Sequence, residues 1–298
     1  MNTRVAKVNG LFIGVLSGAF CLMSPGGRAQ DLYVGETSAT VVNASDVIKI
    51  RPGGFQSVCI SGNYVLGDIA FDRSGNLFVT TGGPIGGGGE VYEYSPGKTR
   101  RLFRQLKSGN LGTIAIDSAG NLFVCNSAID TAGEIYEFSA RGQFSVFASG
   151  LDDPVDIAFD RDGNLFEADI GDGNIYEFIK IHGALSPKAT LFASGLQLPT
   201  ALAFDAKGNL FVADAGAYSI YEYTRDAVRS TFESGLHEVG ALAFDSAGIL
   251  FAGDGDGNIY KFTREGEPSI FATGFNNPFA LAFDPVRSSA VSVLPSRF

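Results

Sequence analysis

A segment of about 40 residues recurs along this 298-residue chain, and the recurrence constrains the fold more than any other feature. Each copy contains an Ala-Phe-Asp-like signature, and its closing aspartates follow one another at intervals of 45, 43, 45, 40 and 39 residues. These closing residues are Asp72, Asp117, Asp160, Asp205, Asp245 and Asp284. A period near forty residues, with several short strands in each repeat, is typical of β-propellers. We therefore expect an all-β chain.

Four short strands can be recognised in a copy, and we name them a to d in chain order. Strand a closes at the aspartate, and a turn such as DRSGN or DAKGN follows, in which Asp and Gly favour a tight reversal. Strand b begins as LFV or LFE, strand c reads VYEY, IYEF, IYEY or IYKF, and strand d ends in FASG or a relative. The alternation of apolar and polar residues in IYEF fits a strand packed between neighbouring sheets.

The two ends of the repeat region supply complementary parts of one further blade. Residues 32–62 contain b (LYVGE), c (VIKI) and d (VCISG) without a preceding a, whereas FALAFD at 279–284 is an a with no b after it. Joined, they make a composite blade that closes the ring and removes its exposed edges. We predict a six-bladed β-propeller of four-stranded blades over residues 30–284, followed by a C-terminal tail over 285–298.

The first 29 residues have the layout of a cleaved secretory signal peptide. Arg4 and Lys7 precede an apolar run from Leu11 to Met23, and Ala29 offers a small residue for cleavage. A single membrane anchor is the alternative, but the run is short for a span and Ser17 and Gly18 interrupt it. We expect an exported protein, periplasmic or extracellular, with no membrane span in the mature chain.

Charge narrows the class of partner. Without residues 1–29 the chain keeps 19 basic and 32 acidic side chains, a net charge of −13. Such a surface repels a phosphate backbone, so nucleic acid is excluded as a partner and a cationic partner is favoured.

The two cysteines of the mature chain, Cys59 and Cys125, align with Phe147 and with Ala168 in other copies. We therefore predict two buried free thiols rather than a disulfide.

The sequence AFDAKGNLFVADAGAYSIYEY and the equivalent segments of the other repeats resemble NHL-repeat propellers and the senescence marker protein/gluconolactonase group of six-bladed propellers. The resemblance covers residues 32–284. In the lactonase group, the resemblance implies a catalytic divalent metal at the channel mouth, held partly by Asn and Asp side chains five residues before the closing aspartate. Here those positions hold Gly67, Gly112, Val155, Thr200, Gly240 and Phe279. None is a carboxylate or an amide, so the ligand positions of that family do not carry over.

The d-to-a and b-to-c connections are expected on one face of the ring, which we call the top face. Counted from the end of b to the start of c, the connections span 11, 10 and 9 residues in the first three copies, then 6, 6 and 5, which predicts a raised wall on one side. Of the basic residues, only Lys107 clearly maps to this face. Its acidic residues are Glu36, Asp130, Asp152, Asp153, Asp169, Asp172, Asp214, Glu238, Asp254 and Asp256, with Asp68 and Asp156 just inside strand a.

Three further motifs carry weaker signals for chemistry. GGPIGGGG at 82–89 lacks the Lys-Ser or Lys-Thr of a phosphate cradle, and His182 and His237 are expected on opposite faces, which argues against a zinc site. DIGDGN at 169–174 and DGDGN at 254–258 suit a hard cation such as calcium, although a hairpin turn is the simpler interpretation. No serine or cysteine nucleophile motif is present, so no catalytic residue is assigned.

Two hypotheses follow. The first is a monomeric exported binding or interaction module for a small molecule or a protein, with the acidic top face as its recognition surface and a divalent cation as a possible cofactor. The second is a metal-dependent, lactonase-like hydrolase with a ligand set drawn from Glu36, Asp68, Asn126 and Asp156. The candidate ligand-binding residues are Glu36, Asp68, Asn126, Asp156, Asp169, Asp214 and Asp254.

Overall fold

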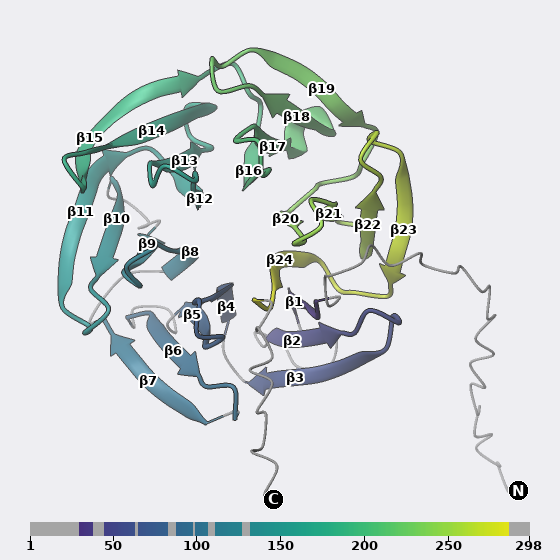
Figure 1. Cartoon of the computed structure of the whole chain (residues 1–298), viewed down its shortest axis with the longest axis horizontal. Helices are drawn as coiled ribbons and strands as arrows, with labels where there is room; N and C mark the ends of the chain where they lie inside the picture. Colours follow the sequence, from purple (N-terminus) through teal and green to yellow (C-terminus); the bar gives the residue numbers. More distant parts are fainter. Residues whose placement is uncertain are drawn as a thin grey trace, which may run out of the picture.

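A computed structural model describes residues 30–285, apart from 38–44, 63–64, 83–87, 98, 107–110 and 127–131. Its strands form six four-stranded antiparallel sheets, arranged like blades around a common axis (Figure 1). The predicted six-bladed propeller is thereby confirmed. The predicted signal peptide and all but the first residue of the predicted tail lie outside the described residues. Among those residues, no helix has the length and apolar character needed to cross a membrane.

Each blade contributes one strand to each of four concentric positions, from a at the axis to d at the rim. The a strands are β4 (Val65–Phe71), β8 (Leu111–Ile116), β12 (Pro154–Phe159), β16 (Pro199–Phe204), β20 (Ala241–Phe244) and β24 (Pro278–Phe283). The b strands are β5 (Leu77–Gly82), β9 (Leu122–Asn126), β13 (Leu165–Asp169), β17 (Leu210–Asp214), β21 (Leu250–Gly253) and β1 (Leu32–Thr37). The c strands are β6 (Glu90–Tyr94), β10 (Gly133–Phe138), β14 (Asn174–Ile181), β18 (Ser219–Tyr223), β22 (Asn258–Phe262) and β2 (Ser45–Ile50). The d strands are β7 (Arg100–Gln105), β11 (Phe144–Leu151), β15 (Ala184–Ala193), β19 (Arg229–Ser234), β23 (Pro268–Thr273) and β3 (Gln56–Gly62).

The composite blade closes the ring as the sequence predicts. Its strand order is β24-β1-β2-β3, and β24 pairs antiparallel with β1 through Leu32↔Phe283 and Val34↔Leu281. Two further bonds fasten the ends of the pair: the Asp31 N–H donates to Asp284 Oδ1 at 2.8 Å, and the Asp284 N–H donates to the Asp31 carbonyl at 3.1 Å. We number the continuous blades 1 to 5 from β4–β7 to β20–β23.

The hydrophobic core lies between neighbouring blades, and aromatic rings fill it. Phe123 on strand b of blade 2 contacts Phe147 on strand d of its own blade and Phe159 on strand a of blade 3, with ring centroids 5.2 and 5.3 Å apart. Equivalent pairs recur around the ring and account for many of the 25 Phe of the chain. Edge-to-face geometry of this kind adds to the stabilisation from burial alone.

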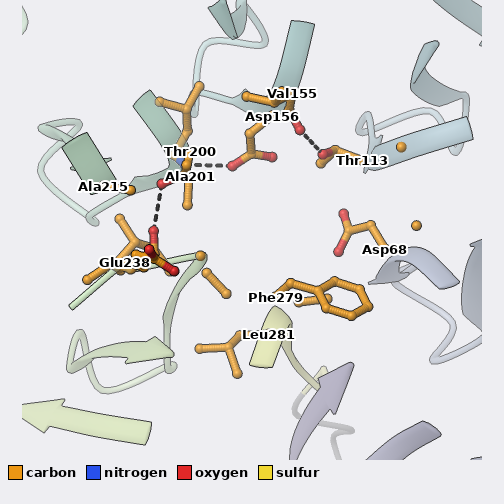
Figure 2. Close-up of a pocket in the computed structure, with 18 of the residues that line it drawn as sticks. Asp68, Thr113, Val155, Asp156, Thr200, Ala201, Ala215, Glu238, Phe279 and Leu281 are labelled. Atoms are coloured by element: carbon orange, nitrogen blue, oxygen red, sulfur yellow. Dashed lines mark hydrogen bonds between the residues drawn. The ribbon is translucent and has the colours of Figure 1, made fainter. Parts of the chain in front are cut away.

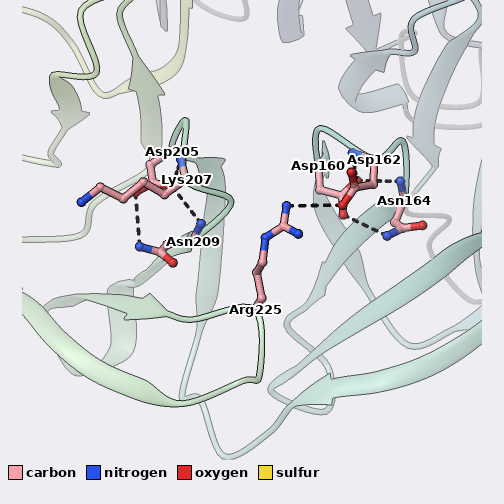
Figure 3. Close-up of polar contacts among 7 residues, drawn as sticks. All are labelled: Asp160, Asp162, Asn164, Asp205, Lys207, Asn209 and Arg225. Carbon is pink, nitrogen blue, oxygen red and sulfur yellow. Dashed lines mark hydrogen bonds and ion pairs between the residues drawn. The ribbon is translucent and has the colours of Figure 1, made fainter.

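The repeated aspartates organise turns on the bottom face, opposite the top face (Figure 3). Asp160 Oδ1 accepts from the Asn164 N–H at 2.8 Å, and its Oδ2 accepts from the Asn164 side-chain amide at 2.9 Å. Gly163, between them, has φ 88°, a conformation that glycine adopts without strain. An ion pair of 3.3 Å between Asp162 and Arg225 joins this turn to the next blade. The most strongly repeated residues therefore build the fold.

The cysteine prediction is confirmed in part. Cys59 and Cys125 are free, and Cys125 is fully buried between blades 2 and 3. Burial raises the pKa of the Cys125 thiol well above its ordinary value, and the nearby carboxyl of Glu167 adds to the shift. The prediction that Cys59 is buried is wrong, because this thiol is partly exposed on a rim strand, where the equivalent Phe147 is partly exposed as well.

Candidate functional site at the channel mouth

A cavity of about 740 Å³ occupies the top of the central channel. The starts of the a strands form its wall, and residues of the d-to-a and b-to-c connections form its rim. The Ala215 N–H donates to the Leu198 carbonyl at 2.9 Å, and the Gly255 N–H donates to the His237 carbonyl at 2.8 Å. These bonds join b-to-c segments to d-to-a segments, so the two kinds of connection do share one face, as predicted.

Asp68, on β4, points into this cavity (Figure 2). Its Oδ2 accepts a hydrogen bond of 3.0 Å from the backbone N–H of Ile114 in blade 2, so the side chain links two neighbouring a strands. The carboxyl is open to the channel on one side and surrounded by protein elsewhere. This burial raises the pKa of Asp68 to about 7, against the opposing effect of the Ile114 bond.

Asp156, on β12, repeats this arrangement two blades further on. Its Oδ1 accepts from the Ile157 N–H at 2.8 Å, and its Oδ2 accepts from the Leu202 N–H of blade 4 at 2.6 Å. Burial raises the pKa of Asp156 well above its ordinary value, and the charge of Asp68 raises it further. The intervening blade carries Thr113 at this position, and the Thr113 hydroxyl donates to the Val155 carbonyl.

The rim of the cavity carries a third carboxyl and an aromatic ring. Figure 2 shows Glu238 across the cavity from Asp68, in the connection before β20. Tyr218 lies in the connection between β17 and β18, is 50% exposed, and stacks on His237 with ring centroids 6.0 Å apart. Tyr218, Glu238 and Asn277 all line the cavity with positive φ values of 52°, 46° and 53°. Non-glycine residues seldom adopt this conformation, which costs energy and tends to occur at functional sites.

The lining itself combines acidic and apolar groups, and just outside it His237 Nε2 lies 3.9 Å from Glu238 Oε1. Asp68, Asp156 and Glu238 are its carboxyls, and none of its described residues is Lys, Arg or His. Apolar side chains cover the wall between them, among them Val155, Leu242 and Phe279. The cavity can therefore bind a positively charged group and, beside it, an apolar body.

Three other candidates, Asp169, Asp214 and Asp254, lie at or just after the ends of equivalent b strands and are 1–2% exposed. Asp169 accepts from the N–H groups of Asp152, Asp153 and Gly171 at 2.8–3.0 Å. Asp214 accepts from the N–H groups of Gln197, Leu198 and Ala217, and Asp254 accepts from the backbone N–H of Asn258. These carboxyls hold the top-face connections in place, and none of the three lines the cavity.

The last two candidates also lie apart from the cavity lining. Glu36 accepts from the Asn276 N–H at 2.8 Å, and burial raises the pKa of Glu36. Asn126 is buried, and its side-chain amide donates to the Tyr136 hydroxyl at 2.8 Å. Among the candidates, the structure therefore brings together only Asp68 and Asp156. The predicted wall of long connections falls largely in 38–44, 83–87 and 127–131, outside the described residues.

The donor set for a metal is sparse in the described part of the chain, where no group of three or more His, Cys, Asp or Glu side chains is placed to hold an ion. At one of the six positions where the lactonase group places ligands, the Thr200 hydroxyl donates to the Val239 carbonyl at 2.6 Å. This bond joins blades 4 and 5, so Thr200 has a structural role.

Sequence reasoning missed Glu167, on β13. This side chain is 0% exposed, and neither carboxylate oxygen has a hydrogen-bond partner. It lies opposite Ile157 in the sheet, among the apolar side chains between blades 2 and 3. Burial raises the pKa of Glu167 well above its ordinary value, and the charges of Asp169, Asp172 and Asp156 add to the shift. The available signal was LFE, where the other copies read LFV, LYV or LFA.

Comparison with solved structures supports the fold. The chain is similar to a nidogen/laminin complex (TM-score 0.70, 18% identity, 86% of this chain and 98% of that chain covered). It is similar to streptogramin B lyase (TM-score 0.62, 12% identity, 87% and 94% covered) and to regucalcin, a calcium-binding protein from Agrobacterium tumefaciens (TM-score 0.60, 15% identity, 76% and 85% covered). No protein-family model and no curated protein sequence matches the chain. At these identities, the likeness establishes a six-bladed β-propeller fold, shared by binding proteins and enzymes.

Proposed function

We propose that this protein is a binding module whose channel mouth takes a small organic cation with an apolar body. The observation that carries the proposal is the cavity lining, which holds three carboxyls and no described basic side chain. A positive group entering the channel meets Asp68 and Asp156 on one side and Glu238 on the other, in a space where protein replaces water. The half-exposed ring of Tyr218 at the rim adds a face for a cation.

The site of action that we propose is outside the cytoplasm, on the basis of the secretory layout of residues 1–29. We further infer a distant relation to the NHL-repeat and gluconolactonase-like propellers, which the repeated sequence motif of the blades supports. A lactonase-like hydrolase is less well supported, because Glu36 and Asn126 are engaged away from the cavity that Asp68 and Asp156 line.

Calorimetric titration with benzyltrimethylammonium, an aromatic cation without a titrating group, tests the proposal. At pH 8, where Asp68 is mostly ionised, we expect one site per chain, weakened by roughly tenfold in Glu238→Gln and in the double variant Asp68→Asn/Asp156→Asn, because each loses negative charge in the cavity. Asn keeps an oxygen acceptor for the neighbouring backbone N–H. Glu265→Gln, an exposed carboxyl absent from the cavity lining, is the matched control and should bind as the parent does.

Absence of binding at about 10 mM probe, or equal affinity in the parent and the channel variants, would refute a cation site in the channel. A parallel titration with calcium chloride separates a metal site from an organic cation site. Tight calcium binding that is lost in the double variant would contradict the proposal in its present form and favour the metal-dependent alternative.

A further inference from the structure

The composite blade departs from the other five at the centre of its aromatic core. In each continuous blade, a Phe on strand b packs edge-to-face on a Phe of strand d, with ring centroids 5.0–5.5 Å apart. The pairs are Phe78–Phe103, Phe123–Phe147, Phe166–Phe192, Phe211–Phe232 and Phe251–Phe271. The composite blade has Tyr33 on strand b and Cys59 on strand d, so a thiol stands where the second ring should be.

A cavity lies between the composite blade and blade 1 at the position of the missing ring, and we call it the seam groove. Its volume is about 600 Å³, and Tyr33, Cys59 and Phe71 line it. Where both phenylalanines are present, the cavity is smaller: the counterpart groove between blades 3 and 4, lined by the equivalent Phe166, Phe192 and Phe204, measures about 180 Å³. The cavity that the equivalent Phe123, Phe147 and Phe159 line measures about 470 Å³. A cysteine side chain is much smaller than a phenylalanine side chain, which accounts for part of the larger volume.

The charge of the seam groove is also reversed relative to its counterpart. Lys49 on strand c takes the place of Glu177, and Arg51 and Arg100 also line the groove. Asp284 is the one described carboxyl in the lining, and Asp31 forms an ion pair with Lys49 beside it. The counterpart groove, by contrast, contains Asp160, Asp162 and Glu177 against Arg225. Three basic side chains against two carboxyls favour an anion in the seam groove.

Aromatic surface and positive charge meet at one place in this groove. Tyr33 packs edge-to-face on Phe71 with centroids 4.9 Å apart, and Lys49 Nζ lies 5.2 Å from the centroid of the Tyr33 ring. The space next to Tyr33, which a strand d phenylalanine fills in the other blades, is therefore bordered by a cationic group.

We propose that the seam groove is a second binding site, for a small aromatic carboxylate. The ring of the ligand takes the place of the missing phenylalanine beside Tyr33 and Cys59, and its carboxylate pairs with Lys49 and the two arginines. Edge-to-face packing and charge-assisted hydrogen bonds then act together. This site is separate from the channel cavity, shares no lining residue with it and has the opposite charge preference.

Titration of the full chain with phenylacetate tests the proposal. We expect saturable binding that weakens roughly tenfold in Lys49→Glu, which introduces the acidic residue of most other blades. The matched control is Lys261→Glu, because Lys261 holds the same strand position in blade 5 but has Phe271 beside it and should leave binding unchanged. Benzyltrimethylammonium binding should be the same in both variants, which separates this test from that of the channel.

Two measurements at Cys59 complete the test. Cys59→Phe restores the missing ring and should abolish phenylacetate binding, and phenylacetate should slow alkylation of Cys59 by iodoacetamide in proportion to its occupancy. Peptide mass spectrometry quantifies the alkylation of Cys59 separately from that of Cys125. Cys125 is fully buried and serves as the internal reference. The proposal is overturned if phenylacetate at about 10 mM neither binds nor protects Cys59, or if Lys261→Glu weakens binding as much as Lys49→Glu.

Discussion

The carboxylate of Asp156 in blade 3 accepts a hydrogen bond of 2.6 Å from the backbone N–H of Leu202 in blade 4. Asp68 and Ile114 repeat this relationship between blades 1 and 2 at 3.0 Å. The a strands have no further strand on the channel side, so their N–H groups need other acceptors. The same two carboxyls therefore join blades and line the channel cavity.

Replacing Asp156 separates its structural role from its charge. Asp156→Ala leaves the Leu202 N–H without its acceptor and should lower the free energy of unfolding by about 1–3 kcal/mol. Asp156→Asn keeps an oxygen for that bond and should be more stable than the alanine variant. Chemical denaturation at pH 7 measures both. Equal stability of the two variants would show that the interblade bond contributes nothing.

The raised pKa of Asp156 also predicts a pH dependence of stability. Because the folded-state pKa exceeds the unfolded value, the contribution of this group is fully present below about pH 4 and is lost as pH rises towards the folded pKa. Asp156→Asn cannot ionise, so its stability relative to the parent should improve from pH 4 to pH 8, on the order of 1 kcal/mol. Denaturation series at the two pH values provide the measurement, and a relative stability that does not change with pH would contradict it.

Glu167→Val should stabilise the protein. Valine stands at the equivalent position in four other copies, at Val34, Val79, Val124 and Val212, and the glutamate oxygens have no partner. We expect a gain of roughly 1–3 kcal/mol at pH 7 that shrinks near pH 4, where the carboxyl is neutral in both states. Melting curves of parent, Glu167→Val and Glu167→Gln check this, and the reverse substitution Val212→Glu should destabilise. A less stable valine variant at pH 7 would show that the carboxyl has a favourable partner.

Cation binding in the channel should depend on pH through Asp68. With a pKa of about 7, this carboxyl is mostly ionised at pH 8 and mostly neutral at pH 5, so benzyltrimethylammonium should bind several-fold more weakly at pH 5. The probe has no titrating group of its own. Asp68→Asn should reduce the dependence, and Asp68→Asn/Asp156→Asn should reduce it further, because the pKa of Asp156 in the same cavity is also raised. An unchanged slope in Asp68→Asn would assign the titration to another group.

Ring closure predicts the effect of truncation. Deleting residues 279–298 removes nearly all of β24 and leaves β1 with an unpaired edge, so the cooperative unfolding transition should be lost. A chain ending at residue 285 keeps every described strand and should retain that transition. Circular dichroism during heating distinguishes the two. A cooperative transition in the shorter chain would mean that the composite blade is not needed for closure.

The sequence by itself determined the architecture, because each blade is a local pattern written several times. The closing aspartates mark the end of one strand and the turn that leads to the next. The incomplete first and last copies together predict the composite blade. The prediction of an acidic top face followed from the same periodicity, since it requires only knowing which connections share a face.

Tertiary structure decided which acidic residues face the channel and which are occupied elsewhere. Asp68 and Asp169 were both candidate ligand-binding residues, yet Asp68 opens to the cavity while the oxygens of Asp169 accept from three backbone N–H groups. Whether a carboxyl is free for a ligand depends on donors that approach from other segments and from neighbouring blades, and a repeat pattern does not specify these. For the same reason, the sequence alone did not reveal the seam groove. Only the packing shows that the partly exposed Cys59 stands where the other blades have a phenylalanine ring.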